Sequence, residues 1–264
     1  MKIRKIKIED KIHKVDKQSK DKNISKKLIT WILCSFLITS ILAVQTNTVF
    51  AAKKSKDSII IGIDPGHQKQ GDSSLEAVGP GSSTKKAKVS SGTSGVSTKV
   101  PEYKLTLAIA KKVKKELKNR GYQVVMTRES NHVKISNKQR AKKINKSGAD
   151  ICIRLHADGI DSSSVTGASA LYPSKENKYV SKLSKKSLKL AESILDTYCE
   201  TTGIKNRGCV KRDDLTGTNW SKVPVIVLEM GFMSNPTEDK KMQQKKFQKK
   251  MVQGICDGID TYYK

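Results

Sequence analysis

The sequence SIIIGIDPGH, residues 58–67, decides the fold. Isoleucine fills four of the five positions 59–63. A short β-branched run of this kind predicts a strand that is buried on both faces, as in a parallel sheet covered by helices. The run ends in Asp64-Pro65-Gly66-His67, so a turn that carries chemically active side chains follows the strand directly.

Two further stretches repeat this arrangement. The apolar run at 151–155 is followed by His156-Ala157-Asp158, and the apolar run at 223–228 is followed by Glu229. Both runs are short and do not alternate with polar residues, which again favours buried strands. Two weaker strands are expected on the same grounds, at 122–127 and 167–172.

Helical patterns separate these strands. A helix is predicted to begin at Pro101 and to stop at Gly121, because apolar residues recur every four positions between them. Ser136 and Gln139 have the spacing of a capping box and predict a second helix. Further helices are expected across 180–194 and from Asn235-Pro236 onward. The alternation predicts an α/β fold, with a mostly parallel twisted sheet flanked by helices on both faces in one domain.

Two segments are expected to be loops. Residues 68–100 are rich in Gly, Ser, Thr and Lys and nearly lack apolar residues, so we expect a long flexible loop there. Residues 206–220 are also interpreted as a loop. The lysines of the first segment are candidates for contact with an anionic polymer; they are Lys69, Lys85, Lys86, Lys88 and Lys99.

Residues 1–51 differ from the rest of the chain. Residues 2–27 are polar and Lys-rich, Leu28–Val44 holds no charged residue, and Val49 and Ala51 fit the positions before a cleavage site. This order is typical of a secretory signal peptide. An uncleaved N-terminal anchor is the alternative, because the apolar run is near the lower limit for a membrane span. Residues 52–264 are therefore expected to be exported, with membrane attachment only through this segment if it is uncleaved.

The chain is strongly basic, with 52 Lys and Arg against 25 Asp and Glu and a formal net charge of +27. An exported basic domain is expected to meet polyanions, and anionic wall polymer is the favoured one; a generally Lys-rich proteome is the alternative. Aromatic residues make up 5% of the chain, and no nucleic-acid-binding motif is present, so nucleic acid is not expected as a partner. Cys152 is expected in the core, and a Cys199–Cys209 pair is left open.

Four residues are candidates for one site. His67, His156 and Glu229 each follow a predicted buried strand, and Glu102 lies in the first turn of the helix after Pro101. Ligands bind outside the carboxyl ends of the strands in open α/β sheets, so these side chains are expected at one edge. Three ligands that bind through nitrogen or oxygen, together with a further carboxylate, are the residues typical of a catalytic zinc site. Each residue alone also has a simpler explanation, as a hydrogen-bonded histidine, a helix-dipole partner or a partner of lysine.

The sequence resembles a known family, the zinc-dependent N-acetylmuramoyl-L-alanine amidases of bacterial cell wall (amidase type 3). The resemblance covers about 59–262. It rests on IGIDPGH (61–67), PEYKLTLAIA (101–110), GYQVVMTR (121–128), SNKQRAKKIN (136–145), ADICIRLHAD (149–158) and VPVIVLEMGFMSNPTE (223–238). It implies a fold with a twisted sheet flanked by helices, in agreement with the pattern above, and makes 52–264 the catalytic domain of a secreted wall enzyme.

The resemblance also implies a site and a reaction. Zinc would be held by His67, Glu102 and His156, with Glu229 as catalytic base. The enzyme would hydrolyse the amide between the lactyl group of N-acetylmuramic acid and L-alanine of the peptidoglycan stem peptide. The segment before Glu102 is longer than the family commonly has and contains Glu76; we expect Glu102 to be the ligand, because a helix start fixes a ligand better than a loop. Arg128 and Arg212 are candidates for contacts to stem-peptide carboxylates, with solvated surface arginines as the alternative.

Other classes remain as alternatives. A zinc peptidase or carboxypeptidase acting on stem peptides would use a similar site. A non-catalytic wall-binding protein is disfavoured because all four site residues are present. The sequence does not indicate whether an activating protein partner is needed.

Overall fold

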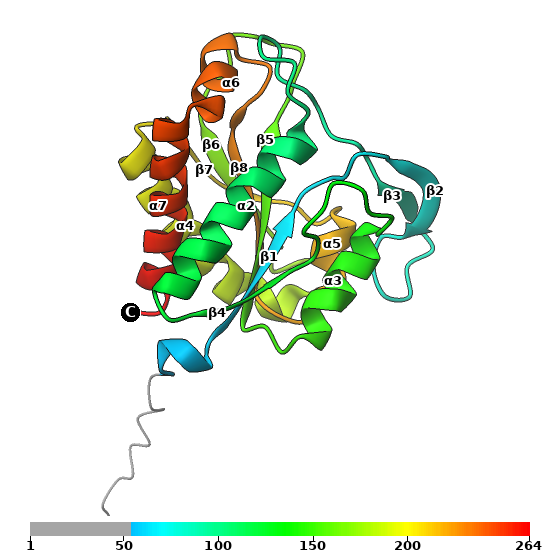
Figure 1. Ribbon diagram of the computed structural model, residues 1–264. Helices are drawn as coiled ribbons and strands as arrows, with labels where there is room; N and C mark the ends of the chain where they lie inside the picture. The colour runs from blue at the N-terminus through cyan, green and yellow to red at the C-terminus, as the bar shows by residue number, and fades with distance from the viewer. Residues whose placement is uncertain (1–53) are drawn as a thin grey trace, which may run out of the picture. The chain divides into compact units, whose positions relative to one another are not determined.

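A computed structural model describes residues 54–264 (Figure 1). The signal peptide expected at 1–51 lies outside the described residues. A six-stranded sheet with the order β4-β1-β5-β8-β6-β7 forms the centre. All neighbouring strands are parallel except β6 and β8. The strands are β1 (Ile60–Pro65), β4 (Gln123–Met126), β5 (Ile151–Asp158), β6 (Ala168–Tyr172), β7 (Asn206–Lys211) and β8 (Val225–Phe232).

Helices cover both faces of this sheet (Figure 1). The long helices α2, α4 and α7 pack on one face, and α3 and α5 lie on the other. The helices are α2 (Glu102–Asn119), α3 (Asn137–Lys146), α4 (Ser184–Thr202), α5 (Thr216–Asn219), α6 (Pro236–Gln243) and α7 (Lys245–Tyr262), with short 3-10 turns η1 (Lys56–Ser58) and η2 (Ser181–Leu183). The predicted mostly parallel α/β fold in one domain is confirmed.

Strand β5 contributes side chains to the hydrophobic cores on both faces of the sheet. Ile151 and Ile153 are buried in the large core on the side of α2, α4 and α7. Cys152 is buried with Ile144 of α3 in the smaller core on the other face. Successive side chains of a strand point to opposite faces, so an uninterrupted apolar run is what a sheet covered on both sides requires.

Helix starts follow the sequence closely. Pro101 is the N-cap of α2, and α2 runs through Asn119 before Gly121 adopts a positive φ. The capping box of α3 is present, with Ser136 accepting from the Gln139 amide and the Gln139 side chain accepting from the Ser136 amide.

The loop expected at 68–100 is not a loop throughout. It contains an antiparallel pair of strands, β2 (Asp72–Ala77) and β3 (Lys85–Val89), which form a separate two-stranded sheet. These strands are polar because most of their residues are exposed, so hydropathy gave no signal. Glu76 and Val89 are buried and tie the hairpin to the domain.

Two other expectations are corrected. The segment 206–220 contains the edge strand β7 and the short helix α5 in place of a continuous loop. The last helix is in fact two helices, α6 and α7, because Gln244 between them is extended. β7 pairs on one side only and its side chains are mostly exposed, which explains its polar sequence.

The cysteines of the described part carry free thiols. Cys152, Cys199 and Cys256 are buried, and Cys209 is half-buried, without a bond to Cys199. Across residues 54–264, every helix is too short or too polar to cross a membrane.

Candidate active site

His67 begins the site directly after β1. Its backbone has φ 61, in the left-handed region, and turns the chain away from the sheet. Nδ1 lies 3.0 Å from the Ser90 carbonyl oxygen. The hydroxyl oxygen of Ser90 lies at the same distance from Nδ1, so the backbone and the side chain of Ser90 both orient the ring. Nε2 lies 3.1 Å from Oε2 of Glu102.

Glu102 lies between the two histidines. It is the first residue of α2 and is 3% exposed. Its Oε1 accepts from the Ala157 amide and lies 3.2 Å from Nδ1 of His156. Its Oε2 accepts from the Thr93 amide. Burial opposes the charged form, but the hydrogen-bonding histidines outweigh it and hold the pKa of Glu102 well below its usual range.

His156 lies within β5, because this strand extends three residues beyond the predicted run. Burial and the nearby His67 lower the pKa of His156 to about 4, although the hydrogen bond with Glu102 acts in the opposite direction, so the neutral ring is favoured. Its Nε2 is buried and has no hydrogen-bond partner among residues 54–264. A neutral imidazole with a partnerless buried nitrogen is suited to a ligand that the protein itself does not supply.

These three residues form a group that fits a metal ion. One ligand atom from each of His67, Glu102 and His156 lies within 4.8 Å of the others. Two imidazoles and one carboxylate are a donor set that zinc accepts in proteins. Gly92 makes the close approach feasible: it has φ +80, and a Cβ there would lie 2.6 Å from Oε2 of Glu102.

Glu229 lies on β8 opposite His156, since the two residues pair in register. It lines a cavity of about 220 Å³ together with His67 and His156. Burial raises the pKa of Glu229 well above its ordinary value, and the negative charges of Glu102 and Asp158 raise it further. The structure therefore brings all four candidate residues to one edge of the sheet, with Glu229 outside the group of three.

A buried ionic network beneath the site escaped the sequence reasoning. Asp64 accepts from Arg140 at 2.9 Å and from Arg154 at 2.8 Å. Arg140 also donates to the His67 carbonyl oxygen at 2.8 Å, which fixes the backbone of a candidate ligand. The only hint in the sequence is that Asp64 shares a turn with His67; neither arginine had a signal, because their partners are distant in the sequence.

The two arginines proposed for substrate contact are placed differently. Arg128 is 2% exposed and donates to the carbonyl oxygens of Pro65, Gly66 and Tyr103. The suggestion that it binds the substrate is therefore wrong, since its donors are used to hold the turn before His67. Arg212 is partly exposed and pairs with Asp214, which lines the active-site cavity.

Glu76 does not belong to the group of His67, Glu102 and His156. Its Oε2 accepts from Oγ of Ser136 at 2.6 Å, and its Oε1 accepts from the Lys138 amide at 2.9 Å. Both oxygens thus serve the N-terminus of α3, where unpaired amides attract negative charge. Glu102, and not Glu76, is the carboxylate that lies with the histidines.

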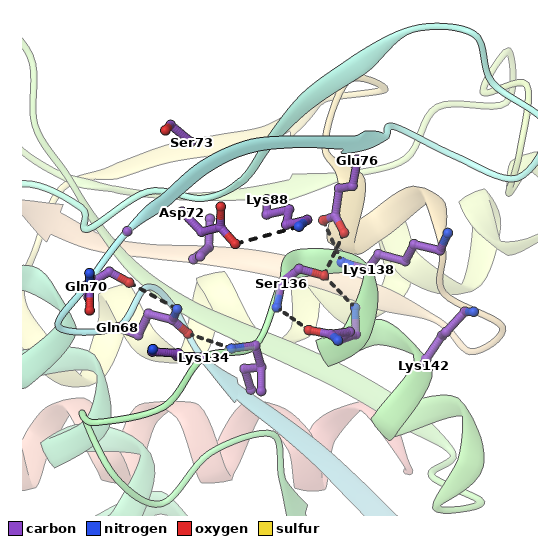
Figure 2. A pocket seen from close by; sticks show the side chains of 14 residues that line it. Gln68, Gln70, Asp72, Ser73, Glu76, Lys88, Lys134, Ser136, Lys138 and Lys142 are labelled. Carbon is purple, nitrogen blue, oxygen red and sulfur yellow. Dashed lines mark hydrogen bonds and ion pairs between the residues drawn. The ribbon is translucent and has the colours of Figure 1, made fainter.

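A larger cavity of about 760 Å³ lies between the β2–β3 hairpin and the start of α3 (Figure 2). It shares Val89 with the active-site cavity. Its carboxylates are occupied, because Asp72 lies 3.8 Å from Lys88 and Glu76 caps α3. We call this space the hairpin groove; four lysines line it, Lys88, Lys134, Lys138 and Lys142.

Known proteins share this fold. An α/β sheet that gathers two imidazoles and two carboxylates at one edge has the composition of a metallohydrolase. Residues 61–261 match the family model described as N-acetylmuramoyl-L-alanine amidase. The chain belongs to that family, as the sequence motifs predicted.

Individual relatives agree with this assignment. The chain is 30% identical over 222 residues to the N-acetylmuramoyl-L-alanine amidase LytC of Bacillus subtilis strain 168, covering 84% of this chain and 39% of LytC. It is 28% identical over 212 residues to the probable cell wall amidase LytH of Staphylococcus saprophyticus, covering 80% of this chain and 60% of LytH. It thus spans less than two thirds of either relative. The crystal structure of N-acetylmuramoyl-L-alanine amidase from Clostridium difficile 630 matches with a TM-score of 0.63 and 27% identity, covering 78% of this chain and 97% of that one.

Proposed function

We propose that this chain is a zinc-dependent amidase that cleaves the bond between the lactyl carbonyl of N-acetylmuramic acid and L-alanine in peptidoglycan. The observation that carries the proposal is the group of His67, Glu102 and His156, with Glu229 in the same cavity. Family membership supports the bond that is cleaved.

The proposed mechanism assigns separate tasks to these residues. His67, Glu102 and His156 would hold the zinc, which when bound supplies the Lewis acidity that polarises a carbonyl and acidifies water. Glu229 accepts a proton from the attacking water and delivers it to the departing amine of L-alanine. Glu229 would be favoured in its ionised form by a cation held by these three residues, which would oppose the effect of burial on its pKa. The backbone hydrogen bonds to Glu102 keep its carboxylate in place between the histidines.

Metal content tests the site. His156→Ala is expected to lose zinc and activity together, because one of three ligands is removed. His132→Ala is the matched control, since His132 is an exposed histidine outside the group and this variant is expected to keep both. Elemental analysis of the purified proteins gives the zinc content. Full zinc retention by His156→Ala would show that the ligand assignment is wrong.

A zinc peptidase acting on stem peptides is the second candidate, and the products distinguish it. Amidase action on purified wall frees the amino group of L-alanine and leaves glycan strands without peptide. Peptidase action frees other amino groups and leaves L-alanine attached to the sugar. Labelling of the new amino termini followed by mass spectrometry reports which bond is cleaved.

The hairpin groove is the proposed contact for anionic wall polymer. Four lysines line this space beside the active-site cavity (Figure 2). Lys88 lies 3.8 Å from Asp72, whereas Lys134, Lys138 and Lys142 have no carboxylate partner among residues 54–264. Of the loop lysines expected to make this contact, Lys86 is instead bound to Asp214, and Lys88 lines the groove.

Salt dependence tests this contact. Replacing Lys88, Lys134 and Lys142 with Gln is expected to raise KM on intact wall at low salt, and the difference should fade as salt shortens the screening length to about 8 Å or less. The control removes the same charge from the exposed side of α2, by Lys111→Gln, Lys115→Gln and Lys118→Gln. Equal KM values for the two triple variants across the salt series would contradict the proposal.

Export to the cell wall completes the proposed function. The LytH relative is named a probable cell wall amidase, and residues 1–51 have the order of a signal peptide or N-terminal anchor. Residues 52–264 would then act as the catalytic domain at the wall, where the substrate is found.

A further inference from the structure

One corner of the active-site cavity is lined by polar side chains outside the metal group: Asn137, Arg154 and Thr216. Asn137 is the first residue of α3, Thr216 is the first residue of α5, and Arg154 precedes His156 by two positions on β5. Arg154 is 6% exposed and Thr216 is 5% exposed, so the corner is enclosed by protein.

Two of the three guanidinium nitrogens of Arg154 donate hydrogen bonds to side chains of the described residues, and Nη1 does not. Nε donates to Asp64 at 2.8 Å, and Nη2 donates to Oδ1 of Asn137 at 2.9 Å. Nη1 has no acceptor among residues 54–264, and Arg154 is one of the residues that line the cavity. A Cβ on Gly217 would lie 2.4 Å from Nη1, so the α5 backbone packs against the group and fixes it.

The other two side chains also offer donors. A guanidinium can only donate, so Asn137 must turn its carbonyl oxygen toward Arg154, and its Nδ2 amide is left without an acceptor in the described part of the chain. The hydroxyl of Thr216 has no side-chain hydrogen bond there either. Three side chains that can each donate a hydrogen bond therefore line this part of the cavity, and a charged guanidinium among them favours an anionic acceptor.

The charge balance favours an anion. Arg140 and Arg154 share the single carboxylate of Asp64, which leaves one positive charge without a partner in this network. Asp214 at the rim is bound by Lys86 and Arg212. Glu229 lines the same cavity, and the positive charge of Arg154 opposes the rise in its pKa, but no hydrogen bond joins the two side chains among residues 54–264.

We propose that Asn137, Arg154 and Thr216 form a carboxylate subsite, which binds an ionised carboxylate on the peptide side of the cleaved bond. This rests on the proposed function, in which the acyl side of the bond is an uncharged lactyl group and acidic groups occur only on the peptide. Two positions along β5 separate Arg154 from His156 by roughly 6.6 Å. An extended peptide spans roughly 3.3–3.6 Å per residue, so the residue after L-alanine reaches the subsite.

A matched pair of substrates tests the subsite. Muramoyl-L-alanyl-D-isoglutamate, in which both glutamate carboxylates are free, and muramoyl-L-alanyl-D-isoglutamine share the γ-carboxylate. They differ only in an α-carboxylate against an α-carboxamide, so the pair tests whether the subsite binds the α-carboxylate. The zinc-loaded full chain is expected to prefer the acid by about 10- to 100-fold in kcat/KM, the range for a hydrogen bond to a charged group. Arg154→Gln is expected to abolish this preference, and Thr216→Val to reduce it by several fold.

Thr218→Val is the matched control, because Thr218 is a buried threonine on the same short helix and does not line the cavity. It is expected to keep the full preference. If Arg154 has only a structural role, Arg154→Gln would lower kcat/KM equally for both substrates and leave their ratio unchanged. That result would overturn the subsite.

Peptide binding separates this proposal from the proposed function. Calorimetry with L-alanyl-D-isoglutamate and L-alanyl-D-isoglutamine reports the same discrimination without catalysis. If neither muramoyl substrate is cleaved but the acid peptide binds more tightly and Arg154→Gln removes the difference, the function fails and the subsite stands. Equal binding of the two peptides by the unmodified chain overturns the subsite.

Discussion

Glu229 has the surroundings expected of a general base. It lines the same cavity as two of the candidate ligands, and it makes no side-chain hydrogen bond within the described part of the chain. A half-buried carboxylate without a structural partner is costly, so its position is explained better by chemistry than by stability.

Glu229→Gln is therefore expected to keep zinc and the fold while lowering kcat by about 10²–10⁴-fold, because an amide does not accept the proton of water. Zinc analysis and wall-digestion rates measure the two effects separately. Glu192→Gln makes the same chemical change on the exposed face of α4 and should leave both unchanged. Loss of zinc in Glu229→Gln would instead make Glu229 a ligand.

The hairpin β2–β3 is attached to the domain by a helix cap. Glu76 of β2 accepts from Ser136 and from the Lys138 amide, so the hairpin and the N-terminus of α3 share one carboxylate. The same hairpin supplies one wall of the hairpin groove (Figure 2). The position of the groove therefore depends on this cap.

Glu76→Ala is expected to lower the free energy of unfolding by about 1–2 kcal/mol, since two donors at a helix start lose their acceptor. Urea unfolding measures it. Glu129→Ala, which removes a surface ion pair with Lys114, is expected to cost less than about 1 kcal/mol. Zinc content should be unchanged in Glu76→Ala, and its loss would mean that Glu76 contributes to the metal group after all.

The domain as a whole depends on one buried carboxylate. Asp64 is 1% exposed and joins β1 to α3 and β5 through Arg140 and Arg154. Burial opposes its charge, but the two arginines and the Thr127 hydroxyl outweigh this and hold the pKa of Asp64 well below its ordinary value of 3.8.

The lowered pKa of Asp64 determines how the stability of the domain changes at acidic pH. A group with a lowered folded-state pKa stabilises fully above its unfolded pKa, so the contribution of Asp64 is present above about pH 4 and is lost as the pH falls further. Asp64→Asn is expected to cost about 3–5 kcal/mol at neutral pH, because it leaves buried arginines unpaired. Its Tm should approach that of the unmodified chain as the pH falls below 4.

The exposed Asp161 provides the control for this series, and Asp161→Asn should follow the unmodified chain at every pH. Thermal unfolding at several pH values gives the Tm of all three proteins. A constant difference in Tm between Asp64→Asn and the unmodified chain from pH 7 to pH 2 would contradict the linkage.

Features that depend on near neighbours in the chain could be predicted before the fold was known. Apolar β-branched runs gave the central parallel strands, and the Ser136–Gln139 spacing gave a helix start. The positions of His67, His156 and Glu229 at the ends of such runs gave the site edge, because parallel strands bring their carboxyl ends together. Local periodicity is sufficient for all of these.

Only the tertiary structure decided the features that depend on distant partners. The polar strands β2 and β7 are held by backbone pairing, which leaves no apolar pattern to detect. Arg128 resembles a surface residue in the sequence. It is buried because its guanidinium donates to the carbonyl oxygens of Pro65 and Gly66, in the turn before His67. The free edge of Arg154 likewise exists because Asp64 and Asn137, far away in the sequence, occupy its other donors. Hydrogen-bond partners of this kind are set by packing, and no spacing along the chain encodes them.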